Sequence, residues 1–495
     1  MRRDLPVSYS TDGAFDLSAR YALVMLGLIA GVRVRFVREC GVVHYGPAPT
    51  GDALWLPADP VAQRALLSRT RMHPTAHDDS AWGRNFLSLF PVDSPDAPLQ
   101  SDIVAAAFFF FSRHEEWTAE EGDQFGRFRE ADSLLGMRGE TDRPVTAEYG
   151  AVLAAGLRAR GYDVPQEDRY EGRAAAAVMT HDIDYLSKFT PGLLFRETVK
   201  NALFNRRRVP LSDRLRRLGE YLRFFRRERD PYVYSILRML EIEQQCGITA
   251  SWLFKAGGRD KRDVSYRLSG ARARMILDLL SGRGHDIGLH PSFNAHDDLP
   301  MLRGEAEKLR AALKHTPVRG SEQMPEWTPV SVRQHYLRFR YPVTWRNQVE
   351  AGFSVDSTLG FAEREGFRGG AAHPFLPFDL EAHRVLPIWE IPLTVMDGTL
   401  AHYRGLDPDA SAVRIAQLLD ITAAAGGTAV LLFHNTAFDR HDFPGWGRVF
   451  KQACESISDG RFYTGSLADT AQSWAASAGY ASLKEVVEVI NSEPA

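Results

Sequence analysis

The chain has 495 residues, 60 Lys and Arg against 63 Asp and Glu, a formal net charge of −3, and 44% apolar residues. This ordinary composition excludes disordered, collagen-like and coiled-coil chains, and it fits about three domains or one barrel with a smaller partner. The near-neutral charge predicts no nucleic-acid partner, and three cysteines without C-x-x-C spacing indicate neither a disulfide framework nor a thiolate zinc site.

No segment has the composition of a membrane-spanning helix. The longest apolar runs, residues 21–32 and 103–111, are shorter than the roughly 20 residues that such a helix needs. The N-terminus begins with basic residues and then turns polar, unlike a secretory signal. We therefore expect a cytoplasmic protein.

Residues 1–170 are predicted to form an N-terminal domain of unknown role. A short β-rich segment at residues 32–37 precedes helical patterns at residues 101–117 and 145–160. The polar, charged residues 165–173 are typical of a linker. No cluster of residue types in this region indicates a chemical function.

Short apolar runs alternate with longer amphipathic segments from residue 174 onward. The predicted strands cover residues 174–180, 248–254, 286–289, 317–320, 353–355, 387–393 and 428–433, and helical spacing covers residues 234–245, 301–314 and 408–424. This alternation predicts a parallel α/β structure, and about seven strands favour a barrel over an open sheet. The barrel is expected over residues 171–475, before a C-terminal helix over 476–495.

A basic insert interrupts this pattern at residues 190–230. Residues 196–229 contain twelve Arg and Lys against four acids, interleaved with Leu, Phe and Tyr. The insert resembles a pair of basic amphipathic helices. It is either a solvated helical excursion or a contact for an anionic membrane face or a phosphate-bearing substrate.

Three predicted strands run directly into ionisable residues: Asp182 and Asp184 after the first, His290 after the third, and His434 after the last. In a β/α barrel the active site is assembled at these strand ends. Asp182 and Asp184 point the same way in an extended chain, so they can divide the work of base and metal ligand. A carboxylate with imidazoles suits Zn²⁺ or a similar ion.

At these residues the chain resembles the polysaccharide deacetylases with a NodB homology domain, carbohydrate esterase family 4. The similar segments are residues 180–184 (Thr-His-Asp-Ile-Asp), 284–290 (Gly-His-Asp-Ile-Gly-Leu-His) and 431–434 (Leu-Leu-Phe-His), in the family's order. The resemblance extends over roughly residues 174–450. It implies a distorted (β/α)7 barrel and metal-dependent deacetylation, in a divergent cytosolic branch with an extra N-terminal domain.

The resemblance also implies roles for individual residues. Asp182 would be the general base, Asp184 and His290 would be metal ligands, and His434 would be the acid that protonates the leaving amine. Arg333 is matched to the family's arginine, which orients the base.

The third metal ligand departs from the family pattern. The family places a second histidine four residues after the first, where this chain has Asn294. Because an amide oxygen is a poorer zinc ligand than imidazole, three outcomes compete: Asn294 binds weakly, His335 or His296 completes the site, or the site is metal-poor. We favour His335, which lies beside Arg333 in the sequence.

Residues near two later strands are candidates for substrate contact: Asp356, Trp389 and Glu390, with Asp397 as a further one. Asp356 is also a candidate to brace His434 by accepting a hydrogen bond. The alternative for Trp389, Glu390 and Asp397 is a structural role.

The leading hypothesis is a zinc-dependent hydrolase that removes an N-acyl group, most simply acetyl, from an amino sugar of a surface-polysaccharide precursor. A nucleotide-linked or lipid-linked sugar would suit the basic insert, with peripheral membrane contact through residues 196–229. One alternative is a metal-free glycoside hydrolase that uses Glu390 with Asp356 or Asp182. The other is an inactive carbohydrate-binding homologue, suggested by Asn294.

Overall fold

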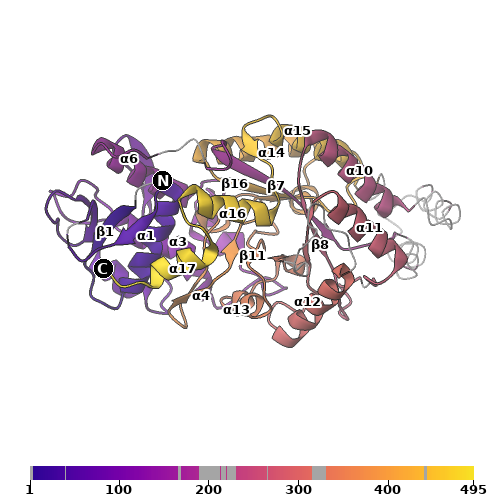
Figure 1. Ribbon diagram of the computed structural model, residues 1–495, viewed down its shortest axis with the longest axis horizontal. Coiled ribbons are helices and arrows are strands. Elements are labelled where there is room, and N and C mark those ends of the chain that lie inside the picture. Colours follow the sequence, from indigo (N-terminus) through magenta and orange to yellow (C-terminus); the bar gives the residue numbers. More distant parts are fainter. Residues whose placement is uncertain are drawn as a thin grey trace.

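The computed structural model describes residues 4–39, 41–164, 169–188, 230–264, 266–314, 330–439 and 443–494, together with residues 195, 212 and 219. The predicted strand over 317–320 and nearly all of the predicted basic insert lie outside these residues. The predicted fold class is confirmed, since a curled parallel sheet with flanking helices adjoins a smaller N-terminal α/β part (Figure 1).

Over the described residues, the main sheet has nine strands, with the order β14-β11-β10-β9-β8-β7-β16-β15 and with β17 paired to β7. All of these pairs are parallel. The strands are β7 (Ala175–Ile183), β8 (Ser251–Phe254), β9 (Asp286–Leu289), β10 (Ser331–Val332), β11 (Val355–Asp356), β14 (Trp389–Glu390), β15 (Val395–Met396), β16 (Thr428–Leu432) and β17 (Phe462–Tyr463). Their carboxyl ends therefore meet at one edge.

Helices connect these strands, and their ends follow local signals in the sequence. They are α10 (Pro231–Cys246), α11 (Ala271–Gly282), α12 (Leu299–Leu313), α13 (Val343–Glu350), α14 (Pro408–Ala425) and α15 (Trp446–Ile457). The carboxylates of Asp230, Asp298 and Asp407 cap α10, α12 and α14, each with proline in the first turn. These three helices confirm the helical spacing seen in the sequence.

The N-terminal part is built on a four-stranded parallel sheet with the order β2-β1-β3-β4. Its strands are β1 (Leu5–Tyr9), β2 (Val34–Phe36), β3 (Val43–Gly46) and β4 (Leu54–Pro57), followed by a hairpin of β5 (His77–Ala81) and β6 (Arg84–Ser88). Its helices are α1 (Asp16–Ala30), α2 (Pro60–Leu66), α3 (Ile103–Phe111), α4 (His114–Trp117), α5 (Leu134–Met137) and α6 (Val145–Ala159).

The two apolar runs of the sequence are largely the buried helices α1 and α3 of this part. Within the described part of the chain, no helix has the length and hydropathy to cross a membrane.

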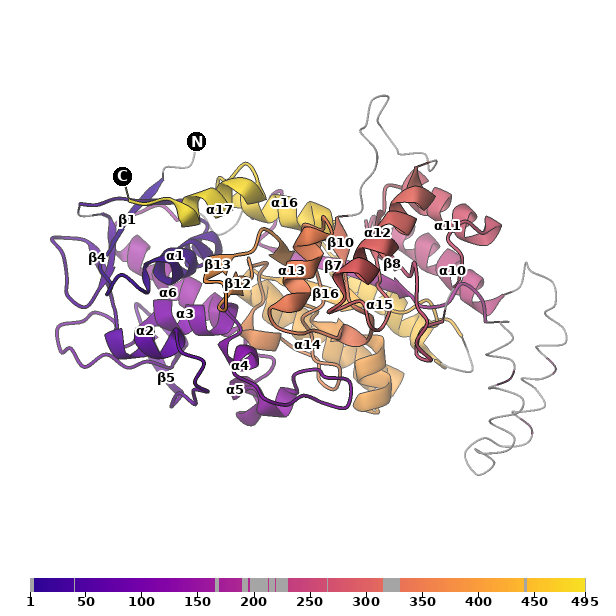
Figure 2. The same ribbon diagram turned by 90° about the horizontal axis from the view of Figure 1, so that it is seen from below.

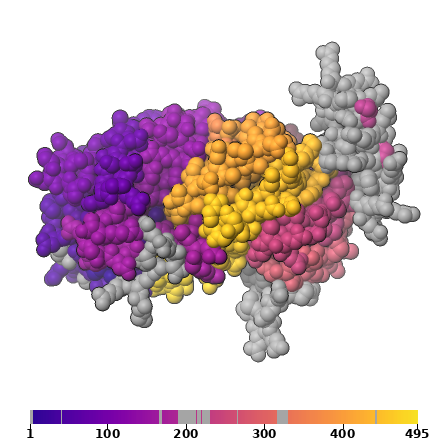
Figure 3. All heavy atoms as spheres, turned by 90° about the horizontal axis from the view of Figure 1, so that it is seen from above, coloured from indigo at the N-terminus to yellow at the C-terminus, as the bar shows by residue number. Residues whose placement is uncertain are grey.

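The N-terminal part packs directly on the main sheet and its loops (Figures 2 and 3). Arg368 donates to both carboxylate oxygens of Glu116, at 2.8 and 2.9 Å, and Arg113 pairs with the same carboxylate. Tyr21 on α1 donates to the carbonyl of Leu376. At the chain's end, α16 (Leu467–Ser477) leads to α17 (Leu483–Asn491), which lies beside α1 (Figure 1). The N-terminal part and the main sheet therefore share a packed interface.

Candidate metal centre

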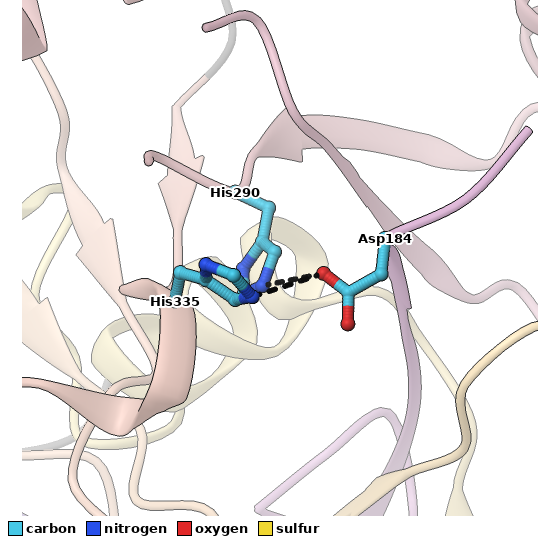
Figure 4. Close-up of side chains that lie close together, drawn as sticks. All are labelled: Asp184, His290 and His335. Carbon is cyan, nitrogen blue, oxygen red and sulfur yellow. Dashed lines mark ion pairs between the residues drawn. The ribbon is translucent and has the colours of Figure 1, made fainter. Parts of the chain in front are cut away.

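Asp184, His290 and His335 converge at the carboxyl edge of the main sheet (Figure 4). Asp184 follows β7, His290 follows β9, and His335 lies just beyond β10. The Oδ1 atom of Asp184 is 3.5 Å from His290 Nε2 and 3.4 Å from His335 Nε2. Because β7, β8, β9 and β10 are parallel neighbours, residues distant in sequence reach one point.

The geometry of this cluster fits a divalent cation. Asp184 Oδ1 is buried and has no hydrogen-bond partner, although it faces two imidazole nitrogens. Burial raises the pKa of Asp184, but its neighbours His335, His290 and Lys255 hold it well below its usual value. One ionised carboxylate and two imidazoles are a ligand set that Zn²⁺ and similar ions prefer.

Hydrogen bonds to the far side of each ring orient the two histidines. His290 Nδ1 lies 2.7 Å from the carbonyl oxygen of Arg333. That oxygen can only accept, so the proton is on Nδ1 and the lone pair of Nε2 faces Asp184. His335 Nδ1 lies 3.0 Å from Asp263 Oδ1, which favours the same tautomer. Burial lowers the pKa of His335, which favours its neutral form.

Asp263 and Lys255 support His335, and the sequence analysis missed both. Lys255 Nζ is 2.9 Å from Asp263 Oδ1 and 3.0 Å from His335 Nδ1, and both Lys255 and Asp263 side chains are 1% exposed. Burial raises the pKa of Asp263, but hydrogen bonds to His335 and Lys255 and the charge of Lys255 bring it to about 2. Lys255 directly follows β8, so its position at a strand end could have identified it as a candidate site residue.

Asp182 lies beside the cluster and contacts Arg333. Arg333 Nη1 is 3.2 Å from Asp182 Oδ1, and Oδ2 of the same carboxylate is 3.7 Å from His290 Nδ1. Arg333 is fully buried and also donates to Thr180 Oγ1 and to the carbonyl and hydroxyl oxygens of Ser357. The structure therefore brings together the two residues that the sequence paired as base and orienting arginine.

His434 lies on the other side of Asp184, with its Nε2 atom 3.9 Å from Asp184 Oδ2. Asp397 holds it, because Asp397 Oδ1 is 2.7 Å from His434 Nδ1 and Oδ2 accepts from the His434 backbone N–H at 2.8 Å. Burial lowers the pKa of His434, but the Asp397 carboxylate outweighs it and raises the pKa to about 10. These contacts favour the protonated form of the His434 imidazole.

The prediction that Asp356 braces His434 is wrong. Asp397 follows β15, the direct neighbour of β16, and His434 lies just beyond β16. Asp356 is on β11, which β10, β9, β8 and β7 separate from β16. Its carboxylate instead accepts a hydrogen bond from Thr358 Oγ1.

The predicted substrate contacts by Asp356, Trp389 and Glu390 also receive no support. All three side chains are buried, at 0%, 3% and 0% exposure. Glu390 accepts from Trp345 Nε1 and from the Leu359 N–H, both at 3.0 Å. Burial and the neighbouring Asp356 raise the pKa of Glu390 well above its usual value. Glu390 and Asp356 are enclosed and so do not face a space in which a glycosidic bond could lie between them. The structure therefore gives no support to a glycoside hydrolase that uses Glu390.

The two alternative third ligands, Asn294 and His296, contact other residues. Asn294 Oδ1 accepts from Arg338 Nη1 at 3.2 Å, and His296 Nδ1 lies 3.4 Å from Asp297 Oδ1. Among the residues that the structure describes, the group of potential metal ligands contains His335 instead.

Sequence comparisons match only the N-terminal part of the chain to a known family. A family model described as a family of unknown function (DUF7033) matches residues 20–162. A search of curated proteins finds no match to the chain.

Several solved structures are similar to part of the chain. A protein from Mycobacterium smegmatis, provisionally assigned as a polysaccharide deacetylase, is 15% identical at a TM-score of 0.41, over 62% of this chain and 92% of that one. The chitin deacetylase of the fungus Colletotrichum lindemuthianum is 11% identical at 0.32, over 63% and 90%. A CE4 family pseudoenzyme from Bacillus anthracis is 9% identical at 0.30, over 60% and 64%. At these values, function has to be argued from this chain's own residues.

Proposed function

We propose that this chain is a metal-dependent hydrolase that removes an N-acyl group, most simply acetyl, from an amino sugar of a glycan precursor. One observation carries the proposal. The Asp184, His290 and His335 cluster lies between Asp182, which is held by Arg333, and His434, which is held by Asp397. A metal-ligand set flanked by a carboxylate base and an imidazole acid can catalyse amide hydrolysis. The motif resemblance supplies the substrate class.

Asp184, His290 and His335 would hold the ion, for which Zn²⁺ is the first choice. When bound, the ion would polarise the acyl carbonyl and lower the pKa of water. The contacts of His290 with the Arg333 carbonyl and of His335 with Asp263 keep the Nε2 lone pairs directed at the ligand position.

Asp182 would accept the proton of the attacking water at its carboxylate. Arg333 holds that carboxylate in place through the contact of its Nη1 atom with Asp182 Oδ1 at 3.2 Å. Because the guanidinium also donates to buried oxygen atoms of Thr180 and Ser357, the arginine has little freedom to move. The base is thereby positioned before substrate arrives.

His434 would donate the Nε2 proton to the departing nitrogen. Its Nδ1–H is directed to Asp397, which leaves Nε2 to face the same side as Asp184 Oδ2. Water adds to the acyl carbon, the C–N bond breaks, and the products are a carboxylate and the free amino sugar. When His434 is protonated again, the Asp397 carboxylate stabilises the imidazolium charge.

The nature of the precursor rests on sequence features. The excess of basic residues over 196–229 supports a nucleotide-linked or lipid-linked sugar whose phosphates would pair with them. The same segment would give peripheral membrane contact from the cytoplasmic side. We assign the reaction to residues 171–475 and a separate role to residues 1–170.

The direct test measures metal content and acetate release from UDP-N-acetylglucosamine and from N-acetylglucosamine oligomers. We expect about one equivalent of bound metal, turnover that a chelator abolishes and Zn²⁺ restores, and no turnover in Asp182→Asn although its metal content is normal. Chelator-resistant cleavage of glycosidic bonds would instead identify a glycoside hydrolase. Sugar binding by a metal-free chain without turnover would identify an inactive homologue.

A further inference from the structure

A loop of the N-terminal part, residues 119–128, lies one side chain away from the candidate metal centre. The ring of Phe125 in this loop is 5.3 Å from the ring of Tyr336, and Tyr336 directly follows His335, with the two rings 4.7 Å apart. Arg338 fastens the loop by donating to the carbonyl of Phe125 at 2.9 Å. In Figure 2, purple chain following α4 extends toward the elements of the main sheet.

Arg127 in the same loop contacts both sides of the site. Its Nη1 donates to the Tyr336 carbonyl at 3.0 Å, and its Nη2 donates to the hydroxyl of Tyr403 at 3.5 Å. Tyr403 ends the helix η6 (Thr399–Tyr403), which follows β15 and Asp397. Arg127 thus connects the segment that carries His335 to the helix η6, which follows Asp397, the hydrogen-bond partner of His434.

The loop is held in one conformation by its own hydrogen bonds. The Asp123 carboxylate accepts from the backbone N–H groups of Phe125 and Arg127, at 2.8 and 3.0 Å, and pairs with the Arg127 guanidinium. The Asp123 N–H donates to the Arg127 carbonyl at 2.8 Å. The loop's own bonds therefore hold Phe125 and Arg127 in position, which lowers the entropy cost of binding.

The backbone beside this loop is strained. Tyr336 and Leu337 have φ values of 63° and 54°, a left-handed conformation that residues other than glycine rarely adopt. Two such residues in succession directly after His335 need support from neighbouring groups, and the bond from Arg127 to the Tyr336 carbonyl is part of it. Strain of this kind collects at binding sites.

The surface beside the loop combines aromatic faces with polar donors. Tyr336 and Tyr403 are 37% and 50% exposed, Phe125 is half-buried, and the guanidinium of Arg262 lies 5.6 Å from the Phe125 ring. A sugar ring presents C–H groups on its face and hydroxyls around its edge. Aromatic rings match that face, while phenol and guanidinium groups bond the hydroxyls.

We propose that Phe125, Tyr336 and Tyr403 form a binding subsite for a sugar ring that adjoins the ring undergoing deacylation. The N-terminal part, through its 119–128 loop, thereby selects the glycan. The position of the reacting ring rests on the function proposed above; the subsite itself rests on the contacts of the loop.

The test uses calorimetric binding of N,N′,N″-triacetylchitotriose and of N-acetylglucosamine to the full chain. Tyr403→Ala and Phe125→Ala should weaken binding of the trisaccharide about fivefold or more, should leave binding of the monosaccharide unchanged, and should retain metal. Tyr234→Ala removes an equally exposed tyrosine (54%) on the outer helix α10 and serves as the matched control.

Equal trisaccharide affinity in wild type and both variants, or no trisaccharide binding by wild type, would overturn the subsite. Loss of metal in Phe125→Ala with unchanged trisaccharide affinity would also overturn the subsite, because the loop would then only position the metal ligand His335. Tyr403 is half exposed, so Tyr403→Ala should not impair folding. This variant therefore tests the subsite even if Phe125→Ala fails to fold. In every binding measurement, that of the wild-type chain included, Asp182→Asn is added so that the ligand is bound without turnover. Absence of acetate release from the chain that retains Asp182 would contradict the proposed reaction and leave the subsite result standing.

Discussion

His434 Nδ1 lies 2.7 Å from Asp397 Oδ1, and the two residues follow β16 and β15, which are hydrogen-bonded neighbours in the main sheet. The second carboxylate oxygen of Asp397 accepts from the His434 backbone N–H at 2.8 Å. Asp397 therefore fixes the position, the tautomer and the charge of the imidazole at the same time.

Replacement of Asp397 by asparagine tests this arrangement. The variant removes the charge that raises the pKa of His434 to about 10, so the imidazole loses its proton at lower pH. A general acid must be protonated to act, hence the alkaline limb of the kcat profile should move to lower pH. At neutral pH we expect turnover to fall by roughly 10²–10³.

Profiles of kcat against pH check the expectation, with Asp409→Asn as the control, since Asp409 is an exposed aspartate paired with Arg448. An unshifted alkaline limb in Asp397→Asn would show that His434 is not the acid.

Replacement of His335 tests the identity of the third ligand. His335→Ala should reduce bound metal to a small fraction of the wild-type content, because only Asp184 and His290 remain. His296→Ala is the matched control and should keep full metal content, since His296 contacts Asp297 outside the cluster. Metal analysis after dialysis distinguishes the two; full metal in His335→Ala would remove His335 from the site.

Asp263→Asn tests the support of the third ligand. The amide can present its N–H₂ group to His335 Nδ1, which would leave the ring's proton on Nε2, where it blocks coordination. Loss of such a supporting carboxylate typically costs about 10–100-fold in metal affinity. Competition with a fluorescent chelator measures this affinity; unchanged affinity would show that Asp263 does not set the tautomer of His335.

Arg333→Ala should lower the free energy of unfolding. Arg333 is fully buried against Asp182, so its removal leaves a buried carboxylate without its partner, a change that costs about 3–5 kcal/mol. Urea unfolding measures the effect. Arg303→Ala, which removes an exposed arginine paired with Glu350, should change the unfolding free energy little, and equal effects of the two variants would contradict the assignment.

Asp102 makes the stability of the N-terminal part depend on pH. Burial raises the pKa of its carboxyl to about 7 from 3.8, so the folded chain binds a proton that the unfolded chain releases above about pH 4. The contribution of Asp102 to stability is therefore full at low pH and falls as pH rises from about 4 to 7. In Asp102→Asn, the difference in unfolding free energy between pH 5 and pH 7 should be smaller than in wild type. An equal difference would contradict this.

Much of the fold and part of the site could be predicted from sequence. Alternating apolar and amphipathic segments predicted the parallel α/β class, and aspartate–proline signals marked helix starts such as that of α10. Asp182 near the end of β7, and Asp184, His290 and His434 just beyond β7, β9 and β16, could be found because the apolar run of each strand ends visibly in the sequence. The two-residue strand β10 (Ser331–Val332) was missed, because two residues are too short for a periodic pattern.

Only the tertiary structure decided which groups are partners. Whether Asp356 or Asp397 contacts His434 depends on the order of strands in the sheet, and strand order is set by packing over the whole chain. The contact of Phe125 with Tyr336 joins residues more than 200 positions apart. Local sequence determines whether a segment forms a helix or a strand and where that element ends. Long-range packing determines which strand ends lie together. The reason is that the hydrophobic effect is non-directional, so an apolar segment can be buried against many different neighbours.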